Sequence, residues 1–262
     1  MLLLPIPIPT IDPLKIKQID IEIRAIYRLI TFSRKHEADD LLDSFLSSTQ
    51  NLKELLSIKN AQMEAQSEEE AAAYVINLNK ALYFITDEIN ANKTFTNQLQ
   101  LFQLFRLTSP ESHELHPNKY RNTDVQIGSI LCPEPKQVPS LVNELFHKLS
   151  FIENPILRAI YFHHELIRIH PFSDGNGRTT RIAKNWMLMY DLYPPIFIRD
   201  EEEKKEYITT LSASFNALHK DPNHWGVHTI NFFKQEIHRI YSNTNLMYNK
   251  IHQMGHLNQK ES

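Results

Sequence analysis

One short stretch of the sequence contains most of the residue types that chemistry on a phosphate chain requires. Residues 170–181 read His-Pro-Phe-Ser-Asp-Gly-Asn-Gly-Arg-Thr-Thr-Arg. Gly175 and Gly177 allow the backbone to approach a ligand closely, and a predicted helix follows them. The N-terminus of a helix presents backbone N–H groups that bind anions. We therefore predict that this stretch holds the phosphates of a nucleoside triphosphate.

The charged members of the stretch have complementary uses in such a site. Arg178 and Arg181 are three residues apart, on one face of the predicted helix, and both can reach the same phosphate chain. Asp174 is a hard oxygen ligand of the kind that Mg²⁺ takes beside substrate phosphates. His170 comes at the end of the preceding predicted helix and can accept a proton near neutral pH. This combination favours transfer of a phosphate-linked group.

The alternative for this stretch is an ordinary surface loop, in which the glycines only turn the chain and the arginines only contact water. Glycine is scarce, however, with five residues in a chain of 262. Two of the five flank Asn176 and are followed by two arginines, so an ordinary loop explains the pattern poorly. A zinc peptidase is excluded as well. His163-His164-Glu165 does not continue as His-Glu-x-x-His, because position 168 is an arginine.

Composition and charge narrow the class of protein further. Apolar residues make up 42% and charged residues 23% of the chain, which is typical of a soluble globular protein. The single cysteine, Cys132, excludes a disulfide framework and a cysteine zinc site. The net charge of −3 excludes wholesale electrostatic binding of nucleic acid. Because no apolar run reaches about 18 residues, we expect no membrane-spanning helix.

The elements that must position the stretch are mostly helices, since 14 prolines and few glycines favour long helices joined by proline-marked turns. Asn154 and Pro155 suit the N-cap and the first helical position of the helix before the stretch, which must end before Pro171. The apolar periodicity predicts helices over residues 16–32, 37–56, 66–85, 97–107, 139–149, 154–170, about 178 to 193, 204–218 and 225–241. The sequence therefore predicts a mostly α-helical protein.

Two segments depart from the helical periodicity. The first residues carry Pro5, Pro7 and Pro9 without a basic start, which predicts an extended arm packed on a surface rather than a Sec-type signal peptide. We accordingly expect a cytoplasmic protein, or one delivered into another cell by a different route. Between residues 109 and 139, only the alternating run Asp124–Ile127, which ends at Gly128, predicts a strand, as part of a short hairpin.

The stretch over residues 170–181 resembles the signature of the Fic family, His-Pro-Phe-x-x-Gly-Asn-Gly-Arg-x-x-Arg, and matches every defined position. Residues 154–159 resemble the start of the helix that precedes this signature, residues 192–195 the turn after the following helix, and residues 120–128 the flap hairpin. The resemblance implies an all-α fold with a small β-hairpin flap. It divides the chain into a helical N-terminal extension (1–100), a Fic core (101–241) and a polar C-terminal tail (242–262).

The resemblance also implies an activity, since most Fic proteins transfer AMP from ATP to a hydroxyl side chain of a target protein. His170 would deprotonate that hydroxyl, and Asp174 would hold Mg²⁺ between the α- and β-phosphates. The implied ATP-binding residues are Gly175, Asn176, Gly177, Arg178 and Arg181. The implied target-docking flap consists of Asp124, Val125, Gln126 and Ile127, which would add a strand to the target segment. The implied partner is therefore a protein substrate, with neither nucleic acid nor a membrane.

Other activities stay open on these residues. Family phosphotransferases carry Ala and Lys at the two glycine positions, so Gly175 and Gly177 argue against phosphate transfer. UTP and CDP-choline as donors are harder to exclude. A non-enzymatic adaptor with the Fic fold is the remaining class, and the intact His170, Asp174 and Arg178 argue against it.

One family feature is degenerate in this sequence. Many Fic proteins have an inhibitory helix with the pattern Ser/Thr-x-x-x-Glu-Gly/Asn, whose glutamate pairs with the second arginine of the signature. The best alignment places Ser47 at its start and Asn51 where the glutamate would stand. An amide can hydrogen-bond Arg181 but supplies no charge, so we expect productive ATP binding with weak inhibition, or inhibition by a separate partner. A homo-oligomer is also open as a partner, because Fic cores dimerise through different surfaces. Glu54, one turn further on, is the rival inhibitory residue.

Overall fold

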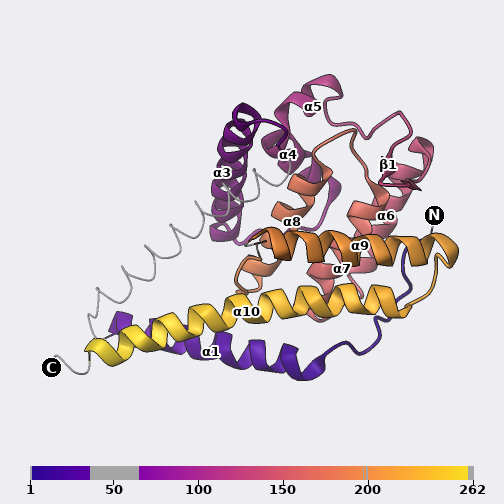
Figure 1. The fold of residues 1–262 in the computed structure, drawn as a ribbon. Helices are drawn as coiled ribbons and strands as arrows, with labels where there is room; N and C mark the ends of the chain where they lie inside the picture. The colour runs from indigo at the N-terminus through magenta and orange to yellow at the C-terminus, as the bar shows by residue number, and fades with distance from the viewer. Residues whose placement is uncertain (1, 36–64, 197, 199, 259–262) are drawn as a thin grey trace.

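Helices make up nearly all of the regular structure in the part of the chain described by the computed structural model, which comprises residues 2–35, 65–196, 198 and 200–258. Their order and arrangement are shown in Figure 1. The helices are α1 (Pro13–Lys35), α3 (Glu68–Asn90), α4 (Gln98–Thr108), α5 (Pro110–Leu115), α6 (Val138–Leu149), α7 (Pro155–Ile169), α8 (Asn176–Tyr190), α9 (Glu201–Lys220) and α10 (Val227–Asn258), with a 3₁₀ turn at Pro135–Gln137. The predicted all-α class is confirmed, whereas the helix predicted over 37–56 lies outside the described residues.

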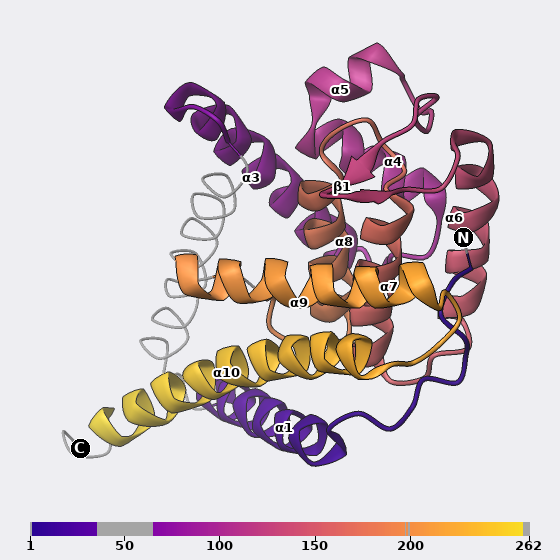
Figure 2. The same cartoon turned by 45° about the vertical axis from the view of Figure 1, so that its right-hand side comes forward.

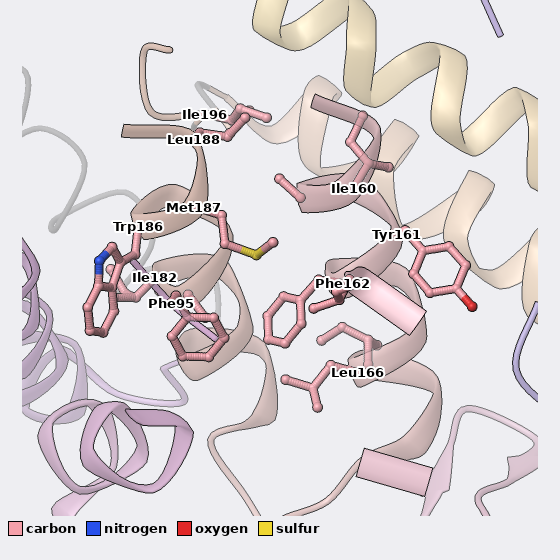
Figure 3. Packing of buried hydrophobic residues seen from close by; sticks show 14 of the residues in the cluster. Phe95, Ile160, Tyr161, Phe162, Leu166, Ile182, Trp186, Met187, Leu188 and Ile196 are labelled. Carbon is pink, nitrogen blue, oxygen red and sulfur yellow. The ribbon is translucent and has the colours of Figure 1, made fainter. Parts of the chain in front are cut away.

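Helices α7 and α8 form the centre of the molecule, and the 170–175 loop connects them directly. Phe95 lies between them, with its ring centroid 5.2 Å from that of Phe162 on α7 and 5.4 Å from that of Trp186 on α8 (Figure 3). Each buried side chain of this size contributes about 1.5–3 kcal/mol through removal of apolar surface from water. The two helices that flank the loop are thereby fixed relative to each other.

The ends of α7 follow the local sequence signals. The Asn154 side chain accepts a hydrogen bond from the backbone N–H of Leu157 at 3.0 Å, and Pro155 occupies the first turn, as the sequence predicts. At the other end, His170 is the C-cap, in the left-handed region with φ of 52°. Helix α8 begins at Asn176, two residues earlier than its predicted start near Arg178, so Gly175 is its N-cap.

The predicted N-terminal arm packs on the molecule and is anchored by two buried residues, Leu3 and Leu4. Leu4 is fully buried, and its backbone N–H donates to Glu165 Oε2 at 3.1 Å. Its carbonyl accepts from the Tyr161 hydroxyl at 2.7 Å. The arm is thereby attached to α7, and the helix that follows it, α1, lies along α10 in both Figure 1 and Figure 2.

Helix α10 continues to Asn258 instead of ending at the predicted residue 241, so residues 242–258 of the predicted polar tail are helical. Thr244 is fully buried, and Asn245 donates to Glu22 Oε1 on α1 at 3.2 Å. Met247 and Tyr248 pack against the core cluster. The segment is polar in composition, but α1, which is distant in the sequence, supplies hydrogen-bond partners and apolar surface for it.

The region between residues 109 and 139 contains the predicted hairpin and one helix that the sequence analysis missed. Strand β1 (Gln126–Ile127) pairs antiparallel with β2 (Ile130–Leu131), with Gly128 at φ of 60° in the turn. Asp124 and Val125 come before the strand, so it is shorter than predicted. The missed helix is α5, which starts at Pro110 and has only six residues, too few to show a period. Within the described ranges, no helix is long and apolar enough to cross a membrane.

Candidate active site

The loop between α7 and α8 begins and ends with a left-handed residue. His170 has φ of 52° and Gly175 has φ of 74°. The backbone N–H of His170 donates to Leu166 O at 3.0 Å, which closes α7. Its ring Nδ1 lies 3.3 Å from Ile167 O. A carbonyl oxygen only accepts, so Nδ1 carries the proton in this contact and Nε2 is the nitrogen that can take up another.

Asn176 holds the loop through its side chain, a role that the sequence analysis did not assign. Its Oδ1 accepts from the backbone N–H of Phe172 at 2.9 Å, and its Nδ2 donates to Phe172 O at 2.8 Å. The Phe172 ring is buried and stacked on Phe105 with a centroid separation of 3.8 Å. The loop is thus tied to α4 on one side and to the first turn of α8 on the other.

Gly175 is required on two counts. Its φ of 74° is unfavourable for residues with a side chain. In addition, a Cβ atom at this position would lie 1.9 Å from Ser109 Oγ and 2.6 Å from Ser109 Cβ. The loop therefore approaches the α4–α5 junction more closely than any residue other than glycine permits. The first turn of α8, which contains Gly177, leaves its backbone N–H groups without partners inside the helix, as an anion site requires.

Arg178 is almost completely buried, at 1% exposure, and its guanidinium is surrounded by hydrogen-bond acceptors and an aromatic ring. Nη2 donates to Asp174 Oδ2 at 2.8 Å, and Nη1 lies 3.2 Å from Thr108 O and 3.4 Å from Glu111 Oε1. The guanidinium carbon lies 3.6 Å from the ring centroid of Tyr74, a cation–π contact. Arg178 therefore orients the Asp174 carboxylate. Arg181, one turn further along α8, is 8% exposed.

Tyr74 brings the N-terminal region to the site, and only its place in a helical pattern was visible in the sequence. It lies on α3, and its hydroxyl donates to Glu70 Oε1 at 2.5 Å. Burial and this hydrogen bond raise the pKa of Tyr74 above its usual range. Hydrogen bonds from the Gln66 backbone and from Tyr74 lower the pKa of Glu70. The ring is thus held over Arg178 as a neutral phenol next to a carboxylate.

Asp174 is the site carboxylate best placed for a magnesium ion. Its side chain is 64% exposed, and one oxygen is directed by Arg178. Mg²⁺ prefers one or two carboxylates together with substrate phosphates and water, so this donor set fits the ion when a nucleotide is present. Among the described residues, no group of three His, Cys, Asp or Glu side chains could hold a metal on its own.

The histidines of the rejected zinc motif belong to the core. His163 Nε2 lies 2.8 Å from the Tyr207 hydroxyl, and His164 contacts Glu165 at 2.7 Å and Ser214 at 2.8 Å. All three residues of the His-His-Glu run are fully buried. Burial lowers the pKa of both histidines, so they are neutral structural groups.

The predicted flap residues are brought to the same end of the molecule as the loop, next to α5 and the α7–α8 connection (Figure 2). Asp124 and Gln126 are exposed, and Val125 and Ile127 are half-buried. The backbone N–H of Arg121 donates to Pro171 O at 2.9 Å, so the base of the flap contacts the loop directly. Ser47 and Asn51, the degenerate inhibitory positions, lie outside the described residues.

Comparison with known proteins agrees with this geometry. Residues 96–188 match the sequence model of the Fic/DOC family. The chain carries a Fic/DOC domain. The matched region runs from the residue before the N-cap of α4 to α8, and it includes the hairpin and the complete 170–181 stretch. The boundaries of 101 and 241 suggested by the sequence stay predictions.

Similar proteins extend the comparison beyond the Fic/DOC domain. Protein adenylyltransferase Fic of Aedes aegypti is 29% identical over 137 residues, which cover 51% of this chain and 28% of that protein. The chain therefore spans less than a third of the length of this relative. A solved Fic-domain signaling protein from Bacteroides thetaiotaomicron has a TM-score of 0.67 at 18% identity, covering 91% of this chain and 97% of that one. A structure of IbpAFic2 in complex with adenylylated Cdc42 has a TM-score of 0.50 at 17% identity, covering 72% and 62%. The structures show a shared fold.

Proposed function

We propose that this protein transfers AMP from ATP to a Ser, Thr or Tyr hydroxyl of a target protein and releases pyrophosphate. The observation that carries the proposal is the complete 170–181 stretch, which places His170 at the end of α7 and continues through the 170–175 loop into the first turns of α8. The name of the Aedes aegypti relative supports adenylyl transfer, and the IbpAFic2 complex supports a protein target.

In the proposed reaction, His170 is the general base. With Nδ1 donating to Ile167 O, Nε2 takes the proton of the target hydroxyl. The hydroxyl oxygen then forms a bond to the α-phosphorus of ATP, while the bond from that phosphorus to the bridging oxygen of pyrophosphate breaks. The pyrophosphate leaves with the negative charge that develops on this oxygen. His170 returns its proton to solvent before the next cycle.

The remaining loop residues would bind and orient the nucleotide. The backbone N–H groups of Asn176, Gly177 and Arg178 in the first turn of α8 face the phosphates, and Arg181 supplies positive charge. Asp174 would hold Mg²⁺, which, when bound, neutralises charge on the phosphate oxygens. Arg178 contributes by orienting the Asp174 carboxylate at 2.8 Å. Positioning and charge stabilisation of this kind are the general basis of phosphate-transfer catalysis.

Labelled ATP tests the proposal in a cell lysate that supplies target proteins. We expect label on protein from α-labelled ATP and none from γ-labelled ATP, and a loss of about 10²–10⁴-fold with His170→Ala, the range of a general base. His147→Ala, an exposed histidine on α6, is the matched control and should transfer normally. Label from γ-labelled ATP would replace the proposal with phosphate transfer. If ATP binds without transfer while labelled UTP or CDP-choline modifies protein, the donor is a different one.

A further inference from the structure

A buried arginine outside the signature, Arg121, links the flap to the catalytic loop. Its side chain is 3% exposed. Nε donates to His170 O at 2.7 Å, Nη1 to Thr123 O at 2.8 Å, and Nη2 to Pro133 O. Nη2 also lies 3.5 Å from Ile169 O. In the described part of the chain, every hydrogen bond of this guanidinium goes to a backbone carbonyl oxygen.

The carbonyls that Arg121 binds belong to two different structures. Thr123 precedes strand β1 and Pro133 follows strand β2, so one guanidinium holds both ends of the hairpin. The third carbonyl belongs to His170, the proposed base, whose backbone has φ of 52°. Non-glycine residues adopt this conformation rarely, and surrounding contacts must maintain it. Only a planar fork of donors can serve all of these acceptors at once.

Burying a cation is costly unless its hydrogen bonds are satisfied. Here the acceptors are neutral backbone carbonyls that make no hydrogen bonds within a helix or a sheet. Hydrogen bonds from a charged guanidinium to such carbonyls are stronger than those from a neutral donor. Loss of the guanidinium would leave those carbonyls unsatisfied, and the backbone hydrogen bond from Arg121 N–H to Pro171 O would be left to join the base of the hairpin to the loop. It would not remove any group from the Gly175–Arg181 segment.

We infer that Arg121 is a positioning residue that holds the flap closed on the loop and fixes the backbone of His170. The inference rests on the proposed function in one respect only, namely that His170 and the flap serve group transfer. It separates two steps: nucleotide binding depends on the α8 end of the loop, whereas transfer also depends on Arg121.

The chain contains its own reporter for the state of the flap. Cys132 is the single cysteine and follows strand β2 directly. It is 7% exposed, and its backbone N–H donates to Val125 O at 3.0 Å across the hairpin. Burial raises the pKa of its thiol to about 11. A closed flap therefore makes the thiol unreactive, and opening of the flap exposes it.

The experiment compares Arg121→Lys and Arg121→Met with the matched pair Arg158→Lys and Arg158→Met. Arg158 is half-buried, with its side chain 29% exposed, and donates a hydrogen bond to Asp191 at 2.7 Å. It lies twelve residues before His170 on α7, about 18 Å away along the helix. Three quantities are measured: the rate at which Cys132 reacts with the thiol reagent DTNB, the Kd for ATP, and kcat with KM for transfer. Thermal unfolding identifies variants that fail to fold, and Arg121→Lys keeps the test available if Arg121→Met is one of them.

We expect Arg121→Lys to raise the DTNB rate about tenfold or more through easier local opening of the hairpin. We expect kcat to fall about tenfold or more while the Kd for ATP changes less than about threefold, because a compact ammonium cannot replace the fork. The Arg158 variants should change neither the DTNB rate nor kcat. An unchanged DTNB rate in both Arg121 variants would overturn the inference, as would a parallel loss of ATP affinity and kcat. If the parent transfers no AMP, the proposed function fails. The DTNB and ATP measurements still test whether Arg121 holds the flap closed on the loop.

Discussion

The two ends of the catalytic loop are held in different ways. At the His170 end, a single guanidinium from the flap base binds backbone carbonyls. At the Arg178 end, most contacts come from side chains: Asp174 and Glu111 accept hydrogen bonds from Arg178, as the Thr108 carbonyl does, and the Tyr74 ring covers the guanidinium. The first end is joined to the hairpin, and the second to α3 and α5.

This difference suggests which steps each region controls. Contacts at the Arg178 end shape the surface next to the first turn of α8, where the phosphates would bind. Contacts at the His170 end align the base with a docked hydroxyl. Substitutions at the Arg178 end should therefore change ATP affinity, and substitutions at the His170 end should change transfer. A change in the support that both ends share, the buried ion pair between α8 and α10, should affect both quantities.

The largest effect is expected in the shared support, from Glu236→Gln. Glu236 on α10 is fully buried and accepts from Lys184 on α8 at 2.7 Å, and it also pairs with Arg239. The substitution leaves the buried Lys184 without a counter-charge and leaves Arg239 with only Glu206, 3.5 Å away, which costs about 3–5 kcal/mol of unfolding free energy. Urea unfolding measures it, and ATP affinity and transfer should fall together. Glu202→Gln, an exposed residue on α9, is the control.

The same carboxylate predicts a pH dependence of stability. Burial alone would raise the pKa of Glu236, but Lys184 and Arg239 outweigh it and lower the pKa to about 2. A depressed folded-state pKa stabilises the protein above the unfolded value of about 4.5, and this contribution is lost as the pH falls toward 2. The parent should therefore lose more stability than Glu236→Gln between these pH values. Equal losses in urea titrations of the two proteins would contradict the assignment.

The next largest effect is expected from Gly175→Ala, which acts between the His170 end and the Arg178 end of the loop. The left-handed φ and the overlap with Ser109 should together cost about 2 kcal/mol or more and weaken ATP binding. Gly128→Ala is the matched control, because Gly128 has φ of 60° but no atom within 4 Å of an added Cβ. It should show only the conformational part of the cost, about 1 kcal/mol. Adding Ser109→Gly to Gly175→Ala should recover the difference, and no recovery would mean that the overlap is unimportant.

The sequence was informative about several features whose controlling contacts are local, although it did not reveal the hydrogen bonds between Asn176 and Phe172. Each of these features depends on residues a few positions apart. They are the cap of α7 by Asn154, the left-handed backbone at Gly175 before the first turn of α8, and the grouping of His170 with Asp174. The hairpin was visible from its alternation and Gly128.

Contacts between distant segments were not predictable from the same patterns. Tyr74 was visible only as an apolar position in α3, and nothing in its neighbourhood indicates that it covers Arg178. The extension of α10 beyond residue 241 depends on α1, which lies at the other end of the chain. Arg121 was part of the recognised flap segment, but its partners are backbone carbonyls. Because every residue has a backbone carbonyl, the types of the partner residues do not indicate these contacts.

The degenerate inhibitory position offers a smaller test at the phosphate end. Asn51→Glu would restore a carboxylate where the family pattern has one, and we expect AMP transfer to fall about tenfold through pairing with Arg181. Asn51→Gln, which adds length without charge, should leave transfer near the parent rate. Transfer by Asn51→Glu at the parent rate would contradict this expectation. A large increase with Glu54→Gly would assign inhibition to Glu54 instead.

An effect of similar size is expected from Tyr74→Leu, and it tests the Arg178 end most selectively. A cation–π contact at a desolvated site contributes about 1–2 kcal/mol, so ATP affinity should fall about five- to thirtyfold when the ring is removed. Tyr74→Phe keeps the ring and loses only the hydrogen bond to Glu70, so its affinity should stay closer to the parent. With saturating ATP, kcat should change little in both variants, because the His170 end and Arg121 are untouched. A lower kcat with unchanged ATP affinity in Tyr74→Leu would show that the two ends of the loop are not independent, since a contact at the phosphate end would then control the base.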